Sequence, residues 1–166
     1  MSAKIAGYLY PEANIQNIGF ERTNYPDGYF DVAIGNVPFG DYRVNDSVYN
    51  SHGFLIHDYF FAKTLDKLRA GGVAAYITTK GTMDKESTKV REFLFKKAEL
   101  LGAIRLPNTA FKNAGTKVTA DILFLQKREK EIENPEWIAV TEDAQGFRIN
   151  SYFVQHPEMI LGTMQE

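Results

Sequence analysis

The sequence contains no cysteine among its 166 residues. A disulfide framework and a thiolate metal site are therefore both excluded. The three histidines do not supply a metal site instead. His52 and His57 are five positions apart, a spacing that does not place two ligands on one helical face, and His156 is remote in the sequence. We therefore expect no bound metal.

Long apolar runs and a strong excess of one charge are missing as well. No apolar run approaches the roughly 18 residues of a transmembrane helix, and no secretory signal is visible, so we expect a cytoplasmic protein without a membrane partner. A net charge of −2 and an isoelectric point near 6 give no overall basic character. Contact with nucleic acid would then depend on a local patch, or on another domain or chain.

What is present is an ordinary globular composition, 44% hydrophobic and 24% charged, with enough length for one domain and a sizeable core. Short apolar runs alternate with segments of helical period, which predicts a doubly wound parallel α/β sheet with helices on its faces. Two consecutive strands joined by a loop without a helix predict an antiparallel pair at one edge. The expected strands are residues 14–21, 30–35, 73–78, 101–106 and 120–126, and the expected helices are residues 2–10, 54–68 (ended by Gly71 and Gly72) and 84–101.

The C-terminal part of the chain differs in character. A charge-rich exit follows residue 127, and residues 137–140 and 147–153 are expected to form a small hairpin. Residues 152–162 are interpreted as an ordered segment that docks onto the rest of a larger protein. We therefore divide the chain into residues 1–127 and a linker and docking extension, residues 128–166.

The most informative stretch is residues 30–40 (FDVAIGNVPFG), where an apolar strand ends abruptly in turn-forming residues. Open α/β sheets bind ligands at the carboxyl ends of their strands. If the ligand is adenine, the Asn36 side-chain oxygen and the Val37 carbonyl, held by Pro38, can accept from the two N–H groups of its amine. Phe39 can stack on a base flipped out of the duplex, which replaces roughly 1–3 kcal/mol of lost stacking. The same residues also fit a plain turn with an aromatic core residue, and the motif alone favours neither interpretation.

Other polar residues near the expected strand ends are weaker candidates. Lys80 and Thr82 follow the strand at residues 73–78, and Lys112 lies in a loop placed to border a DNA cleft. Contact with DNA is one interpretation of these residues, and a solvated loop is the commoner one. His57 falls within a predicted helix and is expected to be structural.

Residues 31–40 resemble the catalytic motif of adenine-specific DNA methyltransferases, which is usually Asn/Asp-Pro-Pro-Tyr/Phe. The likeness extends over nearly the whole chain. It includes the modification subunits of type I restriction systems and, more closely, methylase domains of large phage- and mobile-element-encoded proteins that also carry a Swi/Snf-type helicase. The similar segments are residues 65–78, 102–107, 111 and 121–127 for the type I subunits, and residues 78–85, 115–116 and 152–162 for the phage and mobile-element proteins.

This resemblance implies methyl transfer from S-adenosylmethionine to the adenine amine in DNA, on a Rossmann-like methyltransferase sheet. It assigns Asn36 and the Val37 carbonyl to the amine, Pro38 to the shape of the loop and Phe39 to the flipped base. These four residues form the expected catalytic motif. The implied partners are DNA and the rest of a larger methylase–helicase protein.

The chain departs from the family pattern in two ways. Val37 stands where the family usually has proline, which predicts a looser loop. No Gly-x-Gly turn leads into a helix, so the chain is expected to begin after the cofactor-binding half and to bind S-adenosylmethionine weakly or not at all. Glu21 and Asp31 are the candidate contacts to that cofactor. The missing strands would leave an apolar edge at residues 30–35, which we expect to be covered by residues 14–21 or by a second copy of the chain.

Three functions are compatible with these observations. The leading one is part of an adenine-specific DNA methyltransferase whose isolated chain is inactive. The second is a non-catalytic binding or assembly module of an antirestriction, restriction-modification or helicase protein, which the missing cofactor half favours for this chain. The third, an unrelated nucleotide-binding α/β protein, is disfavoured because no glycine-rich phosphate turn is present.

Overall fold

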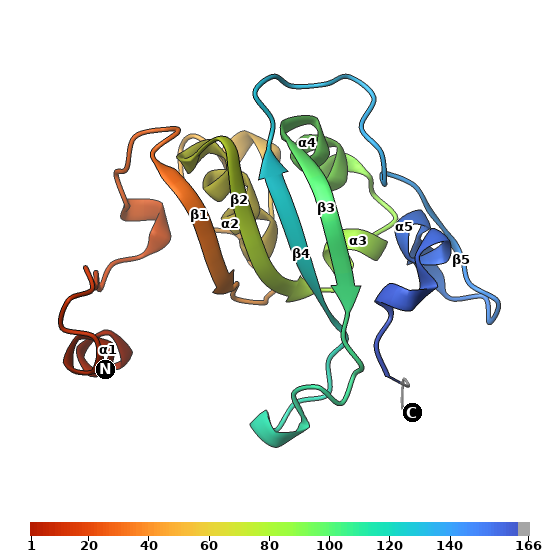
Figure 1. The fold of residues 1–166 in the computed structure, drawn as a ribbon, viewed down its shortest axis with the longest axis horizontal. Helices are drawn as coiled ribbons and strands as arrows, with labels where there is room; N and C mark the ends of the chain where they lie inside the picture. The colour runs from red at the N-terminus through yellow and green to blue at the C-terminus, as the bar shows by residue number, and fades with distance from the viewer. Residues whose placement is uncertain (163–166) are drawn as a thin grey trace.

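A four-stranded mixed sheet forms the centre of the protein, described here for residues 1–162 of a computed structural model. Its strands are β1 (Phe30–Asn36), β2 (Leu68–Thr79), β3 (Ala98–Arg105) and β4 (Ala120–Lys127), in the order β1-β2-β4-β3. β1 and β2 are parallel, whereas β4 runs antiparallel to both β2 and β3 (Figure 1). The predicted α/β class and the antiparallel pair are confirmed.

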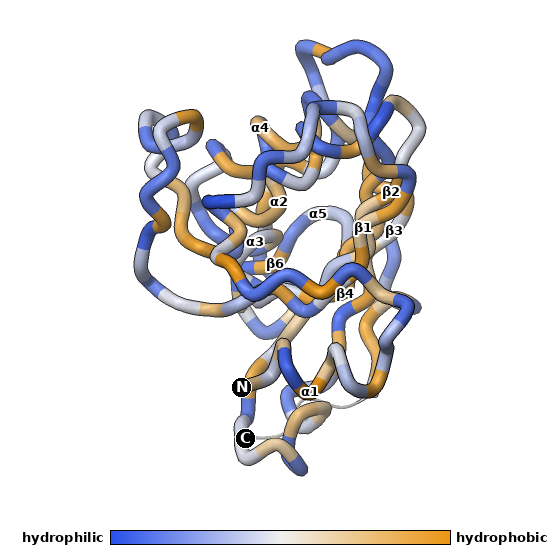
Figure 2. Tube along the Cα trace, turned by 90° about the vertical axis from the view of Figure 1, so that its left-hand side faces the viewer, coloured by the Kyte–Doolittle hydropathy of each residue, from blue (hydrophilic) through white to orange (hydrophobic). Residues whose placement is uncertain are grey.

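The helices cover one face of this sheet. They are α2 (Ile56–Lys67), the short α3 (Gly81–Asp84) and α4 (Lys89–Lys97), and Figures 1 and 2 place them on the same side. Because strand residues alternate between faces, every second residue points towards these helices. The core of this layer consists of Phe61, Leu65, Ala74, Tyr76, Leu94, Leu123 and Leu125, all buried.

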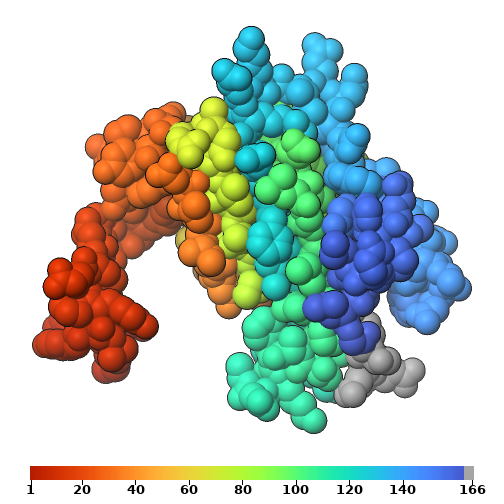
Figure 3. All heavy atoms as spheres, in the orientation of Figure 1, coloured from red at the N-terminus to blue at the C-terminus, as the bar shows by residue number. Residues whose placement is uncertain are grey.

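No helix among residues 1–162 covers the other face. Val32 and Ile34 lie on it with 61% and 82% of their surfaces exposed, and the strand atoms reach the surface in Figure 3. The expectation of helices on both faces therefore holds for only one face of the described chain. The expectation arose because the strands are apolar on both sides, which is typical of strands covered twice.

β1 is an edge strand, and residues 14–21 do not cover it. That stretch is not a strand: it is irregular and ends in the 3₁₀ helix η1 (Phe20–Arg22). Phe20 packs against Phe60 of α2, with ring centroids 4.8 Å apart, and this contact draws the segment towards the helix layer. The predicted strand is wrong, and so is its role as a cover. Coverage by a second copy of the chain stays a prediction.

The N-terminal helix α1 (Ser2–Leu9) has no buried residue and projects from the body as an arm (Figures 1 and 3). Its existence and bounds agree with the predicted helix over residues 2–10. Ile5, Tyr8 and Leu9 are exposed along it. Packing on the rest of the described chain therefore contributes little to the stability of this arm.

Two boundaries differ from the sequence-based expectation. Gly71 and Gly72 do not end α2 but lie inside β2, where the register with β1 shifts. A side chain at Gly72 would come within 2.9 Å of the Asp31 carbonyl oxygen, so glycine allows a close approach of two strands. The predicted helix over residues 84–101 is also too long, because α4 ends at Lys97 and Leu101 is an exposed residue of β3.

The C-terminal segment packs on this chain's own sheet. β5 (Val140–Glu142) and β6 (Arg148–Asn150) form the expected small hairpin, and α5 (Ser151–Gln155) follows directly. Tyr152 of α5 is buried, and its hydroxyl accepts a hydrogen bond from the Ala103 N–H of β3 at 3.1 Å. The remaining short 3₁₀ helices are η2 (Asn50–His52), η3 (Lys112–Ala114) and η4 (Pro157–Met159). No helix within residues 1–162 has the length and apolarity to cross a membrane.

A buried charged cluster lies at the first turn of α2. His57 Nε2 is 3.5 Å from Asp58 Oδ1, and Asp58 Oδ2 is 3.5 Å from Lys85 Nζ. Both His57 and Asp58 are almost fully buried. Burial lowers the pKa of His57, an effect that Lys85 reinforces and that Asp58 and Asp41 oppose. A histidine enclosed in this way has the structural role expected of it.

Replacing Tyr152 by phenylalanine should destabilise the protein by about 1–3 kcal/mol, because the Ala103 N–H would stay buried without its acceptor. Urea unfolding followed by circular dichroism measures the loss. Val154→Ala on the exposed side of α5 is the matched control and should change stability by less than about 0.5 kcal/mol. Equal unfolding midpoints for the two variants would show that α5 does not hold the sheet.

The free energy of unfolding should fall as the pH is lowered from about 7.5 to about 5.5. His57 in the unfolded chain binds a proton near its ordinary pKa of 6.5, whereas the folded chain keeps it neutral to lower pH. The unfolded state therefore binds more protons in this window, and stability is lost as the pH falls through it. Urea titrations across the window, on the wild type and His57→Gln, test this. The variant should show a smaller slope, and an unchanged slope would contradict the assignment.

Candidate functional site

The motif Asn36-Val37-Pro38-Phe39 lies where β1 ends. Val37 continues the pairing with β2, because its N–H donates to the Ile77 carbonyl at 3.1 Å. Its side chain is only 4% exposed and belongs to the main core. Proline lacks an N–H and could not make this bond. The looser loop expected from valine is therefore not what the structure shows at this position: Val37 holds the start of the loop against the sheet.

The two residues around this anchor are presented to solvent. Asn36 is exposed, and its side chain makes no hydrogen bond to any other residue in the described part of the chain. Phe39 is 37% exposed. Pro38 lies between them, half-buried. An amide and an aromatic ring are thus held at the carboxyl edge of the sheet with their binding groups unused.

The loop that follows the motif is tied to α2. The Tyr42 carbonyl accepts from the Ile56 N–H at 2.9 Å, and the Tyr42 ring packs so close to Gly40 that a side chain there would come within 2.5 Å of it. Further along, Asp46 accepts from the Tyr59 hydroxyl at 2.8 Å and from Lys63 Nζ at 3.1 Å. Burial opposes the charge of Asp46, but these hydrogen bonds outweigh it and lower its pKa. The motif therefore sits between two fixed supports, β2 and α2.

Both residues expected to contact S-adenosylmethionine have partners within the chain, and Asp31 lies away from the motif. Asp31 lies near the amino end of β1, five residues and roughly 17 Å from Asn36 at about 3.3 Å per residue, and pairs with Arg69 at 2.6 Å. Glu21 lies in η1, where its side chain pairs with Arg22 and its carbonyl accepts from Lys63. Asp31 is thus at the far end of the strand from Asn36, and both carboxylates are engaged in ion pairs within the chain.

The expected DNA contacts have mixed outcomes. Lys80 is exposed at the carboxyl end of β2, and Lys112 is exposed in η3, in the loop that extends below the sheet in Figure 1. Thr82 is buried instead, with its hydroxyl 3.0 Å from that of Thr78. The chain turns into α3 directly after Lys80, and this turn points Thr82 inward. Thr82 is therefore not available for DNA in this structure.

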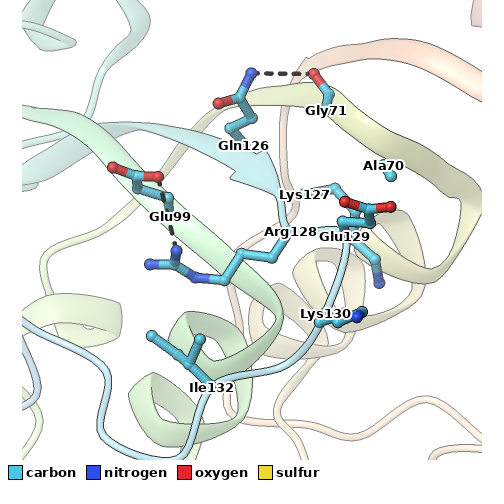
Figure 4. A pocket seen from close by; sticks show the side chains of 9 residues that line it. All are labelled: Ala70, Gly71, Glu99, Gln126, Lys127, Arg128, Glu129, Lys130 and Ile132. Carbon is cyan, nitrogen blue, oxygen red and sulfur yellow. Dashed lines mark hydrogen bonds and ion pairs between the residues drawn. The ribbon is translucent and has the colours of Figure 1, made fainter.

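A hollow of about 540 Å³ lies at the opposite end of the sheet from the motif (Figure 4). Gln126 closes one side through a hydrogen bond to the Gly71 carbonyl at 3.2 Å, and Arg128 pairs with Glu99 at 3.7 Å. The basic and acidic side chains around it largely offset each other. Parallel strands place ligand chemistry at their carboxyl ends, so this hollow is not the candidate active site.

A second hollow, of about 300 Å³, lies at the carboxyl end of the sheet. Lys80 lines it together with Arg105, Phe147 and Arg148, from three distant parts of the chain. Of these residues, only Lys80 was predicted from the sequence to contact DNA. The one local signal for the others was an aromatic residue, Phe147, placed between a turn-forming glycine and Arg148.

Comparison with known proteins gives the family and the fold. The model of the N-6 DNA methylase family matches residues 12–151. A phage relative, the Defense against restriction protein B of Escherichia phage P1, is 33% identical over 138 residues, which is 80% of this chain and 6% of that protein. The chain thus spans a small part of its curated relative.

Solved structures agree on the fold. A modification subunit described for a type I restriction enzyme of Vibrio vulnificus has a TM-score of 0.52 at 18% identity, over 74% of this chain and 37% of its own. The M protein of the type I restriction enzyme EcoKI has a TM-score of 0.50 at 22% identity, over 70% and 25%. A class I S-adenosylmethionine-dependent methyltransferase of Listeria monocytogenes has a TM-score of 0.51 at 23% identity, over 69% and 36%. The sheet is therefore part of a methyltransferase-like fold, and by its family match over residues 12–151 the chain belongs to the N-6 DNA methylases.

Proposed function

We propose that this chain supplies the adenine-holding part of an adenine-specific DNA methyltransferase, which transfers a methyl group from S-adenosylmethionine to the exocyclic amine of a flipped adenine. The observation that carries the proposal is the end of β1. There the buried Val37 fixes the backbone, and the exposed Asn36 and Phe39 on either side of Pro38 have free binding groups. Family membership supports the same chemistry.

The proposed roles follow from the chemistry of an aromatic amine. Its nitrogen lone pair is delocalised into the ring, so the amine attacks poorly unless acceptors favour a more tetrahedral nitrogen and stabilise its developing charge. The Asn36 side-chain oxygen and the Val37 carbonyl are the proposed acceptors. Phe39 is the proposed stacking surface for a base that has left the duplex. No general base is needed before attack, so this role does not require a histidine beside Asn36.

The partner in this proposal is the rest of a methyltransferase, which would bring the cofactor site. Support comes from the uncovered face and edge of β1, where Val32 and Ile34 are exposed although their residue types favour burial. A second copy of the chain is the alternative occupant of that edge. DNA is the proposed substrate in either arrangement, and the proposed division at residue 127 would leave residues 128–166 as an extension.

Binding of a flipped base can be tested on the chain directly. A duplex with 2-aminopurine opposite an abasic site offers a base that leaves the stack easily, and stacking on Phe39 should quench its fluorescence. Phe39→Ala should weaken this binding about 5- to 150-fold, which corresponds to roughly 1–3 kcal/mol. 2-Aminopurine has no amine at C6 and reports stacking on Phe39 alone, so the Asn36 acceptor is tested with the same duplex carrying adenine, in competition against the 2-aminopurine duplex. Asn36→Ala should weaken binding of the adenine duplex by removing an acceptor, while Phe39→Tyr should retain most of the binding to either duplex. Fluorescence titration measures each constant.

Tyr29→Ala is the matched control, because Tyr29 is an exposed aromatic residue at the other end of β1. It should leave the 2-aminopurine titration unchanged. If Phe39→Ala and Asn36→Ala bind as the wild type does, the motif does not hold the base and the proposed function fails.

S-adenosylmethionine should not bind this chain with micromolar affinity, because Asp31 lies at the far end of β1 from Asn36 and the Glu21 side chain is paired with Arg22. Isothermal titration calorimetry with S-adenosylmethionine measures this directly. A micromolar dissociation constant would show that the described residues do form a cofactor site, and the division of the site between this chain and a partner would then be wrong.

A second candidate is a non-catalytic module, and the name of the phage relative favours it, since that protein is described as a defence against restriction. In this case the fold would serve for binding or assembly, and the motif would hold no base. The titrations with the 2-aminopurine and adenine duplexes separate the two candidates, because a non-catalytic module has no reason to lose affinity when Asn36 or Phe39 is replaced.

A further inference from the structure

The hollow of about 300 Å³ at the carboxyl end of the sheet has the size of a small-ligand site, which typically starts near 300 Å³. Its walls are the residue after β2 (Lys80), the end of β3 (Arg105) and the turn that joins β5 to β6. All of these lie at the same end of the sheet as Asn36. The hollow is therefore on the side where the proposed DNA substrate would lie.

The floor of the hollow is a closed ion cluster. Arg105 binds Asp121 through two hydrogen bonds, at 2.8 and 2.9 Å, and reaches Asp84 at 2.8 Å. Its guanidinium also lies 4.2 Å from the centre of the Phe153 ring. Arg105 is almost completely buried, and its charge is already offset by the two carboxylates. Such a floor does not favour a phosphate deep in the hollow and instead suits an uncharged, hydrogen-bonding ring.

The rim carries an aromatic ring on a rigid turn. Asp143 Oδ1 accepts from the N–H groups of Gln145 and Phe147, both at 2.9 Å, and the Asp143 N–H donates to the Phe147 carbonyl at 2.9 Å. Gly146 has a φ of 80°, which this tight turn requires. Phe147 is nevertheless 67% exposed. The backbone is thus fixed around a large apolar side chain that contributes little to the core.

The hairpin that carries this turn is anchored to α3. The Asn150 N–H donates to Asp84 Oδ1 at 2.9 Å, and the Asn150 side-chain amide donates to the Met83 carbonyl at 3.1 Å. Asn150 is fully buried. The position of Phe147 relative to Lys80 is therefore set by hydrogen bonds and not by an isolated flexible loop.

Two cations lie at the mouth of the hollow. Lys80 is exposed, and Arg148 is half-exposed; among residues 1–162 the structure pairs Arg148 with the exposed Glu86, at 3.3 Å. An exposed pair of this kind contributes little to stability, so Arg148 can exchange it for a phosphate at little cost. A stacking ring flanked by cations is the combination that binds single-stranded nucleic acid.

We propose that this hollow binds an unpaired DNA nucleotide close to the flipped adenine, with its base stacked on Phe147 and its neighbouring phosphates on Lys80 and Arg148. The identification of DNA as the ligand rests on the proposed function. Arg105 is three strand spacings from Asn36, which is roughly 14 Å at about 4.8 Å each, or about four nucleotide steps of 3.4 Å. One DNA substrate can therefore reach both places.

Fluorescence anisotropy with a labelled, mixed-sequence single strand of about 16 nucleotides tests this on the full chain. Phe147→Ala should weaken binding about 5- to 150-fold, and Phe147→Tyr should retain it. Lys80→Gln and Arg148→Gln should each weaken binding and lower the salt slope by about 0.7, the value for one phosphate contact on a single strand. A fully paired duplex should show no dependence on Phe147.

Tyr8→Ala and Lys4→Gln on the α1 arm are matched controls, since α1 has no buried residue, and both should bind as the wild type does. Phe147 is exposed, so its variants should keep the wild-type urea midpoint. Unchanged binding of Phe147→Ala would overturn the nucleotide site, even if Phe39→Ala still weakens binding of the 2-aminopurine duplex and Asn36→Ala that of the adenine duplex. The reverse result, loss with Phe147→Ala but wild-type binding of those duplexes by both motif variants, would support the nucleotide site and reject the proposed base pocket.

Discussion

The hydrogen bond from the Val37 N–H to the Ile77 carbonyl is the contact on which the candidate site depends. It extends the β1–β2 pairing one residue past the end of β1, and the buried Val37 side chain fixes the same point from the core. Asn36 before it and Phe39 after it can then be exposed without being mobile, because the backbone between them is held. Preorganised groups of this kind lose less entropy when they bind than groups on a free loop.

The support extends in both directions along the chain. β2 runs from the anchor to Lys80, and α3 then turns Thr82 inward to meet Thr78. Asp84 at the end of α3 forms an ion pair with Arg105 and accepts a hydrogen bond from Asn150, in the hairpin that carries Phe147. The motif at Asn36 and the second hollow are thus connected through β2 and one buried polar network, although Asn36 and Phe147 are more than a hundred positions apart in sequence. Asp84 also lines the hollow, so a change there would affect both its floor and the hairpin that carries Phe147.

Much of the fold was predictable because local pattern and tertiary context agree for β1, β2, β4 and α2. The strand predicted over residues 14–21 was wrong because apolar residues alone do not make a strand. Phe20 packs on Phe60 of α2, and the segment does not pair with the free edge of β1. The prediction that Gly71 and Gly72 end α2 was wrong because glycine is common both at helix ends and where two strands approach closely. Only the position of the partner strand, which the sequence does not show, distinguishes the two cases.

For the site, sequence chemistry placed Asn36 and Phe39 at the end of a strand, and the structure has both exposed there, while their roles in binding stay proposals. It misplaced Asp31 and Thr82, because nearness in sequence says nothing about which end of a strand or which face of a turn a side chain occupies. Phe147 and Arg148 are brought to the sheet only by tertiary contacts of Asn150.

The exposed edge of β1 places a final constraint on any complete site. Ile34 is 82% exposed on a strand whose apolar residues favour burial, so a covering strand is physically favoured. β1 pairs with β2 in parallel, and a strand added to the free edge in the same direction would lie about 4.8 Å from β1. Its carboxyl-end loop would then arrive directly beside Asn36. The same contact that removes the apolar edge would therefore bring a partner's loop to Asn36, so that burial of the edge and completion of the proposed site would be a single event.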